Sequence, residues 1–324
     1  MKDNRFFILS LAVILLISCS ESKTGPRLLA DSSGRINTVT VVMPKNDWNG
    51  SLGQSVREEL EKEYEGLPLV EPQFTVNHMP PKLFDGFAKH SRNILLFVQD
   101  SFPKVNLYQD LYAKPQVVSE IRGEDADIQA FLYKENAKLI SATMVENERK
   151  EKQRRIRKSL AKGTAFRNQL GMQFTYPSAY KTFKIDSQFV WIQKEIPKGH
   201  LNLIAYPVKG RLSDIAKGNS IQRLRDSIGK KMIPGRLPGS YMATEEEYRP
   251  YFYKSKLGDR EVYITKGVWS VANDYMAGPY VHYLIKDPEK NQWTAVEGFT
   301  FAPSINKREY MFELETIIRS IQWK

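Results

Sequence analysis

The chain has 324 residues, of which 41% are hydrophobic and 26% are charged, a composition typical of globular rather than disordered proteins. This length favours two domains, because single domains usually have about 100–200 residues. The formal net charge of +11 favours acidic partners or anionic surfaces without identifying one. The single cysteine, Cys19, excludes an intramolecular disulfide and a cysteine-based metal site.

The first 18 residues have the pattern of a signal peptide. Lys2 and Arg5 form a short positive segment, and an apolar stretch follows at residues 6–17, interrupted only by Ser10. A membrane-spanning helix needs roughly 20 apolar residues, so this stretch is too short to cross a bilayer. We therefore expect residues 1–18 to be removed from the mature protein.

The segment Leu16-Ile17-Ser18-Cys19 resembles the lipobox of bacterial lipoproteins. The resemblance implies that Cys19 is acylated and becomes the mature N-terminus, which would anchor the protein to an envelope membrane. Ser20, rather than Asp, follows the cysteine and favours the outer membrane, on either its periplasmic or its surface face. The alternative is an ordinary secretory signal with a chance cysteine. Residues 19–34 are polar and are predicted to form a flexible tether.

Residues 35–162 are predicted to form an α/β domain with a mixed sheet and helices. Apolar runs that indicate strands alternate with segments of helical periodicity. The predicted strands are 38–43, 74–76, 93–98 and 112–121, and the predicted helices are 51–66, a short one at 80–89 with Leu83, Phe84 and Phe87 on one side, and a long one from residue 124.

The long helix is predicted to end in a basic segment. Its apolar positions are Ile128, Phe131, Leu132, Leu139, Ile140 and Met144. Residues 146–162 then carry a net charge of +5. Arg154, Arg155, Arg157 and Lys158 are candidates for contact with an anionic surface, such as lipid headgroups, lipopolysaccharide or an acidic protein. The alternative is the solvated end of a helix that links the two domains. Nucleic acid is not an expected partner of an exported chain.

Residues 163–324 are predicted to form an α+β domain with an antiparallel sheet and flanking helices. Short segments of period-two alternation indicate the strands. The predicted strands lie near 174–176, 189–191, 201–205, 251–255, 260–264, 280–285 and 293–301, with a turn at 287–291, and the predicted helices are 213–230, carrying Ile215, and one from residue 306.

Common catalytic and cofactor motifs are absent from the sequence. Only four histidines occur, and no two share a short spacing. The patterns of zinc hydrolases, serine hydrolases, P-loops and dinucleotide-binding folds do not occur. We therefore expect no cofactor and no metal site.

Two irregular segments of the second domain are candidate binding loops. In residues 267–279, Trp269, Asn273, Asp274 and Met276 combine aromatic, polar and flexible side chains, as binding rims do. In the alternative interpretation, Trp269 and Met276 simply close the end of the sheet. Residues 234–241, rich in Pro and Gly, form a second such loop.

Several short segments carry a resemblance to a known family. They are the lipobox, Trp48-Asn49-Gly50, Arg92-Asn93-Ile94-Leu95, Lys114-Pro115-Gln116, the residues from Trp269 to Gly278-Pro279, and Glu297-Gly298-Phe299 with Ala302-Pro303 and Lys307-Arg308. Together they resemble a domain-of-unknown-function family of Gram-negative lipoproteins over nearly the whole mature chain, which implies no activity. Ala277 stands where that pattern has glycine. The second domain alone is similar to the α+β sandwich of photosystem-associated and LpqN-like lipoproteins, which implies a binding or assembly module.

Two hypotheses of function follow from the sequence. The first is a non-enzymatic envelope lipoprotein that binds a protein or an anionic envelope polymer across its two domains. The second is an envelope hydrolase or transferase whose site is assembled in space from residues such as Asp274, His282 and Glu297. An acidic cluster with a histidine in a deep pocket would favour the enzyme, and an aromatic groove would favour binding.

Overall fold

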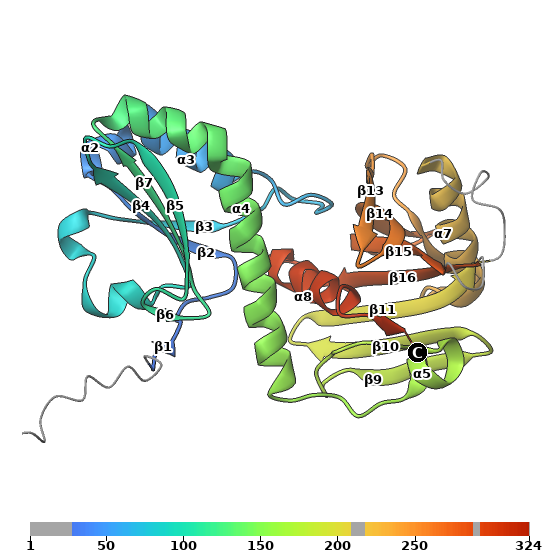
Figure 1. Cartoon of the computed structure of the whole chain (residues 1–324). Helices are drawn as coiled ribbons and strands as arrows, with labels where there is room; N and C mark the ends of the chain where they lie inside the picture. Colours follow the sequence, from blue (N-terminus) through green and yellow to red (C-terminus); the bar gives the residue numbers. More distant parts are fainter. Residues whose placement is uncertain (1–27, 209–217, 288–291, 324) are drawn as a thin grey trace, which may run out of the picture.

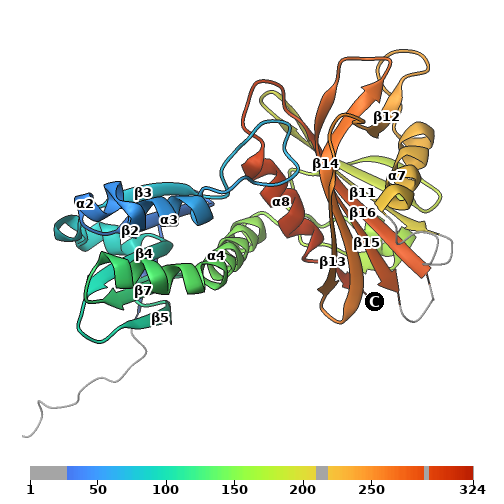
Figure 2. The ribbon, with the colours of Figure 1, turned by 90° about the horizontal axis from the view of Figure 1, so that it is seen from above.

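The computed structural model describes residues 28–208, 218–287 and 292–323. It shows two α+β domains, one with a mixed sheet and one with a curled antiparallel sheet, which confirms the predicted fold class. The long helix α4 (Ala126–Arg157) runs from the first domain to the second (Figure 1; Figure 2). Cys19 and the predicted signal peptide lie outside the described residues.

The first domain is built on a five-stranded sheet in the order β3-β2-β4-β7-β5, in which only the edge strand β5 is antiparallel. Helices α3 and α4 pack on one face of this sheet, over a core that includes Val41, Leu95 and Ile121. The bounds are β3 (Thr75–Met79), β2 (Thr38–Val42), β4 (Asn93–Gln99), β7 (Val117–Gly123), β5 (Lys104–Gln109), α2 (Lys45–Asn49) and α3 (Ser51–Leu60).

Several predicted elements of this domain were wrong in detail. The predicted helix at 80–89 is two 3-10 turns, Pro81–Leu83 and Gly86–His90, and Leu83 and Phe87 are exposed. The predicted strand at 112–121 is divided into β6 (Ala113–Lys114) and β7 by Pro115 and Gln116. Part of the segment predicted as a tether is folded, because β1 (Ala30–Asp31) pairs with β6.

Helix α4 buries only part of the predicted stripe, in which Ile140 and Met144 face the core as predicted. Tyr133, Ala137, Ile140 and Met144 face the core at spacings of three and four residues. Phe131 and Leu139, predicted to face the core, are largely exposed. Tyr133 and Ala137 on the buried face are less hydrophobic than the exposed Phe131 and Leu139. The hydrophobic pattern of the sequence therefore indicated the wrong residues at these positions.

The second domain is a curled antiparallel sheet in the order β12-β14-β15-β16-β11-β10-β9. Helix α7 covers one face and helix α8 the other, so each face has its own apolar cluster. The bounds are β12 (Tyr241–Thr244), β14 (Arg260–Ala272) with β13 (Tyr251–Leu257) paired to it, β15 (Ala277–Asp287), β16 (Gln292–Phe301), β11 (Gly199–Val208), β10 (Phe189–Ile196), β9 (Lys181–Asp186), α7 (Gly218–Met232), α8 (Arg308–Ile318), α5 (Ala165–Leu170), β8 (Met172–Gln173) and β17 (Gln322–Trp323).

Some predicted features of this domain differ from the structure or lie outside its described part. Residues 174–176 are not a strand, although Phe174 and Tyr176 are buried against the core. The predicted helical residue Ile215 and most of the predicted turn at 287–291 lie outside the described residues. Strand β14 runs to Ala272, eight residues beyond the predicted end at residue 264.

The two domains are joined by ion pairs and a shared helix cap. Glu71 of the first domain accepts hydrogen bonds from the backbone N–H groups of Lys307 and Arg308, at 2.6 and 3.0 Å, at the start of α8. Basic residues of α4 contact carboxylates of α8, with Arg149 at 3.5 Å from Glu315. The basic segment of α4 therefore carries interdomain contacts and is not simply a solvated helix end.

Candidate functional site

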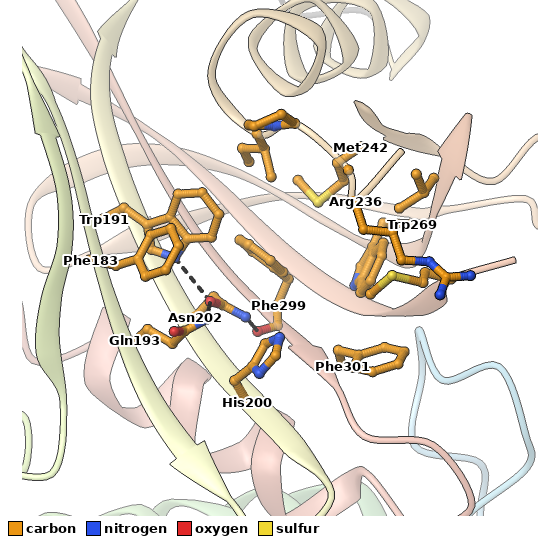
Figure 3. Close-up of a pocket in the computed structure, with 15 residues that line it drawn as sticks. Phe183, Trp191, Gln193, His200, Asn202, Arg236, Met242, Trp269, Phe299 and Phe301 are labelled. Carbon is orange, nitrogen blue, oxygen red and sulfur yellow. Dashed lines mark hydrogen bonds between the residues drawn. The ribbon is translucent and has the colours of Figure 1, made fainter. Parts of the chain in front are cut away.

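A cavity of about 200 Å³ opens on the α7 side of the curled sheet, at the end where the β14–β15 hairpin turns (Figure 3). Most of its lining side chains are apolar or aromatic, and a few are polar. The lining residues are Phe183, Trp191, Gln193, His200, Asn202, Ile233, Pro234, Gly235, Arg236, Met242, Trp269, Val271, Met276, Phe299 and Phe301.

One wall of the cavity combines two aromatic rings with a pair of amides. The rings of Phe183 and Trp191 lie 4.4 Å apart between centroids. Asn202 Oδ1 accepts hydrogen bonds from Trp191 Nε1 at 2.9 Å and from Gln193 Nε2 at 3.1 Å (Figure 3). These bonds fix the orientation of the indole and of both amides, so the side chains of this wall hold one another in place.

The alternation of strand residues explains why these side chains meet. Trp191 and Gln193 are two residues apart in β10, so both point to the same face. Gln193 is the direct partner of Asn202 in the β10–β11 register. Leu201 and Leu203, which flank Asn202, point to the opposite face and join the core under α8.

The opposite wall is formed by the β14–β15 hairpin. Trp269 packs against Phe299 at 6.0 Å in an edge-to-face arrangement. A Cβ atom at Gly278 would lie 2.1 Å from the carbonyl oxygen of Thr300 and 3.0 Å from Trp269 Nε1. Only glycine therefore allows the backbone to approach the indole this closely at that position.

An ion pair lies at the mouth of the cavity. Arg236 Nε and Nη2 donate to Asp274 Oδ2 and Oδ1 at 2.7 and 2.9 Å, a bidentate arrangement that joins the two loops. The hydrogen bonds from Arg236 hold the pKa of Asp274 below its usual value. Tyr275 and Leu237, adjacent in sequence to this pair, are exposed. The mouth therefore combines one fixed cation with apolar groups.

The structure brings most of the predicted loop residues to this cavity. Trp269 and Met276 line it, and Asp274 positions the lining residue Arg236. Asn273 occupies the turn, with a φ of 66°. The loop itself is shorter than predicted, because Trp269 lies within β14 and only residues 273–276 connect the two strands.

The strand residues of the cavity were not predicted as site residues. Phe183, Trp191 and Phe299 look like ordinary core residues in a strand pattern. Asn202 was the one residue whose position in the sequence could have indicated this wall. It lies between two leucines in a predicted strand, and a buried amide there requires a hydrogen-bond partner.

Comparison with known protein families supports the two-domain organisation. Residues 159–320, half of the chain, match the family Domain of unknown function (DUF4837). The chain belongs to the DUF4837 family. Residues 32–157 match a second family, Domain of unknown function (DUF8532). The predicted resemblance to families of unknown function is confirmed, with two families in place of the expected one.

Every residue that lines the cavity lies within the DUF4837 region. The sequence matches no curated protein. Among solved structures, LpqN from Mycobacterium tuberculosis, a protein involved in cell envelope biogenesis, is 10% identical with a TM-score of 0.31, and the match covers 47% of this chain and 83% of that chain. A protein from Bacteroides thetaiotaomicron is 13% identical with a TM-score of 0.26, covering 48% and 45%. TM-scores this low carry no argument about function.

The DUF4837 region also contains the residues of the enzymatic hypothesis, but does not assemble them at one open site. His282 and Glu297 are direct partners across β15 and β16 and are both 0% exposed. Glu297 Oε1 accepts hydrogen bonds from the buried Arg225 at 2.9 and 3.1 Å. Asp274 pairs with Arg236 instead. Since no surface reaches His282 or Glu297, a substrate would have no access to them.

Burial sets the protonation of this internal cluster. It raises the pKa of Glu297 and lowers the pKa of His282 to about 3, with Arg225 acting on His282 in the same direction. The ring of His282 is therefore neutral at physiological pH. Its Nε2 lies 3.5 Å from the hydroxyl of Tyr206. This arrangement is that of a structural polar cluster beneath α7.

The predicted anionic-surface residues lie at the end of α4, just before the DUF4837 region. Arg154 pairs with Glu151 and Asp31, and Arg155 pairs with Glu151 and donates to the Gly34 carbonyl oxygen. These contacts hold the N-terminal segment against α4. Arg157 and Lys158 are exposed at the helix end.

Metal-binding clusters and membrane-spanning helices are both absent from the described residues. In that part of the chain, no cluster of three or more His, Cys, Asp or Glu side chains could hold a metal ion. Among the same residues, no helix is long and apolar enough to cross a membrane.

Proposed function

We propose that this protein is a non-enzymatic binding protein of the cell envelope, which takes an apolar ligand into the cavity on the α7 side of its curled sheet. The observation that carries this proposal is the lining: aromatic and aliphatic side chains surround the cavity, while the amides of Gln193 and Asn202 lie on one wall and the guanidinium of Arg236 lies on the other side. A preformed apolar pocket with a few fixed polar groups is the usual form of a small-molecule or side-chain binding site.

The dimensions and chemistry of the cavity limit the ligand. Its volume of about 200 Å³ is smaller than the roughly 300–1,000 Å³ of pockets for drug-sized molecules. It suits a single ring, a short acyl chain or a large apolar side chain of a partner. The amide of Gln193, the ring of His200 and the guanidinium of Arg236 would bind a polar group attached to that apolar body.

The cellular location in this proposal rests on the N-terminus. Lipid on Cys19 would hold the protein at an envelope membrane, most simply the outer membrane, as the segment Leu16-Ile17-Ser18-Cys19 favours. The expected partners are that membrane and an envelope protein or anionic polymer, and not nucleic acid. A Cys19→Ala variant should lose its fractionation with membranes, and retention there would contradict lipid anchoring.

Binding to the cavity can be measured with an uncharged aromatic probe. The chain from Ser20 onward is titrated with toluene, a probe with the single ring that the cavity can hold, and the heat of binding is recorded by isothermal titration calorimetry. Phe183→Ala removes one wall of the cavity, and its side chain is 57% exposed, so the fold should tolerate the change. Ile185→Ala is the matched control, because this exposed residue lies on the same strand and outside the cavity.

The proposal predicts saturable binding to the wild-type chain, weaker binding to Phe183→Ala and unchanged binding to Ile185→Ala. Absence of saturable binding, or equal binding to all three chains, would contradict it.

A further inference from the structure

A second cleft, separate from the aromatic cavity, lies between the two domains. Its volume is about 430 Å³. Its walls come from the loop after α3, from α4, and from β14 and α8 of the second domain. The lining residues are Lys62, Tyr64, Gln73, Lys138, Ser141, Ala142, Val145, Arg149, Lys266, Phe312 and Glu315.

Helix α4 places a continuous stripe of residues along this cleft. Lys138, Ser141, Ala142, Val145 and Arg149 follow one another at spacings of one, three and four residues, which keeps them on one side of the helix. Two of them are basic. The cations Lys62 and Lys266 approach the same cleft from the loop and from β14.

Glu315 lies at the cleft and is outnumbered by cations. It is 4% exposed, and its carboxylate lies 3.5 Å from Arg149, 3.3 Å from Lys266 and 3.4 Å from Arg319. Burial opposes its ionisation, but these cations hold the pKa of Glu315 well below its usual value. Arg149 also pairs with Glu146 at 3.2 Å, so three cations face two carboxylates and one positive charge remains in surplus at this position.

Some donors of the cleft have no acceptor in the part of the chain that the structure describes. Arg149 Nε is buried and donates to no partner there. Within the same residues, no carboxylate lies within ion-pair distance of Lys138 Nζ. Lys62 pairs with Glu59 at 2.7 Å but is about half exposed, so its ammonium can also face the cleft.

We propose that this interdomain cleft binds the phosphate group of an anionic ligand. Several cations converging from two domains, with unfilled donors among them, suit a compact group with many acceptor oxygens. Because the ligand would contact both domains, its binding also stabilises their mutual arrangement. The site differs in position and chemistry from the aromatic cavity, so neither proposal depends on the other.

The test uses the full chain in a non-ionic maltoside detergent and isothermal titration calorimetry. Pyrophosphate represents a free phosphorylated ligand, and glycerol phosphate represents a lipid headgroup. The site variant is Lys62→Gln with Lys138→Gln, both at exposed positions. The control is Lys104→Gln with Lys150→Gln, which removes the same charge at exposed positions outside the cleft.

We expect at least one of the two compounds to bind the wild-type and control chains, with about tenfold lower affinity for the site variant. Tighter binding of glycerol phosphate would identify a lipid headgroup as the source, and tighter binding of pyrophosphate a free ligand. No binding of either compound, or an equal loss in the site variant and the control, would overturn the proposal. Binding of the apolar probe should be the same in both variants, which keeps this test separate from that of the aromatic cavity.

Discussion

Arg236 and Asp274 are 38 residues apart in sequence, and form a bidentate ion pair with distances of 2.7 and 2.9 Å at the mouth of the aromatic cavity. Each residue belongs to one of the two irregular loops of the second domain. Met276 and Gly235, from the same two loops, line the cavity. The pair therefore joins the two loops to each other beside the cavity.

Asp274→Asn should weaken ligand binding more than it weakens the fold. The variant keeps a side chain of the same shape but loses the charge that holds Arg236. We expect a several-fold loss of probe affinity and a loss of at most about 1 kcal/mol in the free energy of unfolding, because the Asp274 side chain is buried but that of Arg236 is largely exposed. Asp259→Asn, at the β13–β14 turn, should affect neither quantity. If the loss of unfolding free energy were as large as the loss of binding free energy, the pair would act only by stabilising the fold.

Gly278→Ala should destabilise the second domain. The added Cβ would meet the Thr300 carbonyl oxygen and Trp269 Nε1, so the β14–β15 hairpin must shift. We expect a loss of about 1–3 kcal/mol in the free energy of unfolding, measured by urea denaturation. Ala277→Gly, at the exposed neighbouring position where a glycine was expected from the family pattern, should cost no more than about 1 kcal/mol. Equal effects of the two changes would contradict the packing argument.

Stability should fall on acidification, in part because of His282. The pKa of this ring is about 3 in the folded chain, against an ordinary value of 6.5 when it is exposed to water by unfolding. Below pH 6.5 the unfolded chain therefore binds a proton that the folded chain does not, and stability falls by about 1.4 kcal/mol per pH unit. His282→Gln removes this dependence. Between pH 7 and pH 5 the wild type should lose about 2 kcal/mol more than the variant, and parallel unfolding curves would contradict the account.

Glu71→Ala should weaken the connection between the domains. The change leaves the backbone N–H groups of Lys307 and Arg308 uncapped at the start of α8. Loss of such a cap costs about 1–2 kcal/mol, which urea denaturation can detect. Glu61→Ala, at an exposed position before the same loop, serves as the control. A larger effect of Glu61→Ala than of Glu71→Ala would argue against the interdomain cap.

Long apolar segments were predictable, because their periodicity reflects burial on one or two faces. The run at 93–98 became β4 at the centre of the first sheet. Strand β5 was missed because its residues lie at an edge of the sheet, where polar side chains are tolerated and no alternation is imposed.

Glycine was the main source of error around the site. Gly267 and Gly278 belong to the segment predicted as a loop, but both lie inside strands. Their function is close packing, since a Cβ at Gly267 would meet the ring of Tyr280 at 3.0 Å. A single sequence does not distinguish a glycine that bends the chain from one that admits a neighbour.

Part of the candidate site was predictable from a local pattern in the sequence. Trp269, Asp274 and Met276 lie near one another in sequence, so a local pattern identified them. The other wall depends on the pairing of β10 with β11 and on the order of strands in the sheet. These long-range relationships are not present in any local pattern.

The most direct test of the account is photo-crosslinking from inside the aromatic cavity in living cells. p-Benzoylphenylalanine replaces Phe301, which lines the cavity, or Phe252, an aromatic residue on β13 outside it. The chain is purified after irradiation, and adducts are identified by mass spectrometry. The account predicts a recurring apolar adduct at position 301 that is absent at position 252 and reduced by Phe183→Ala. The same adducts at both positions, or none at position 301, would contradict a binding function for the cavity.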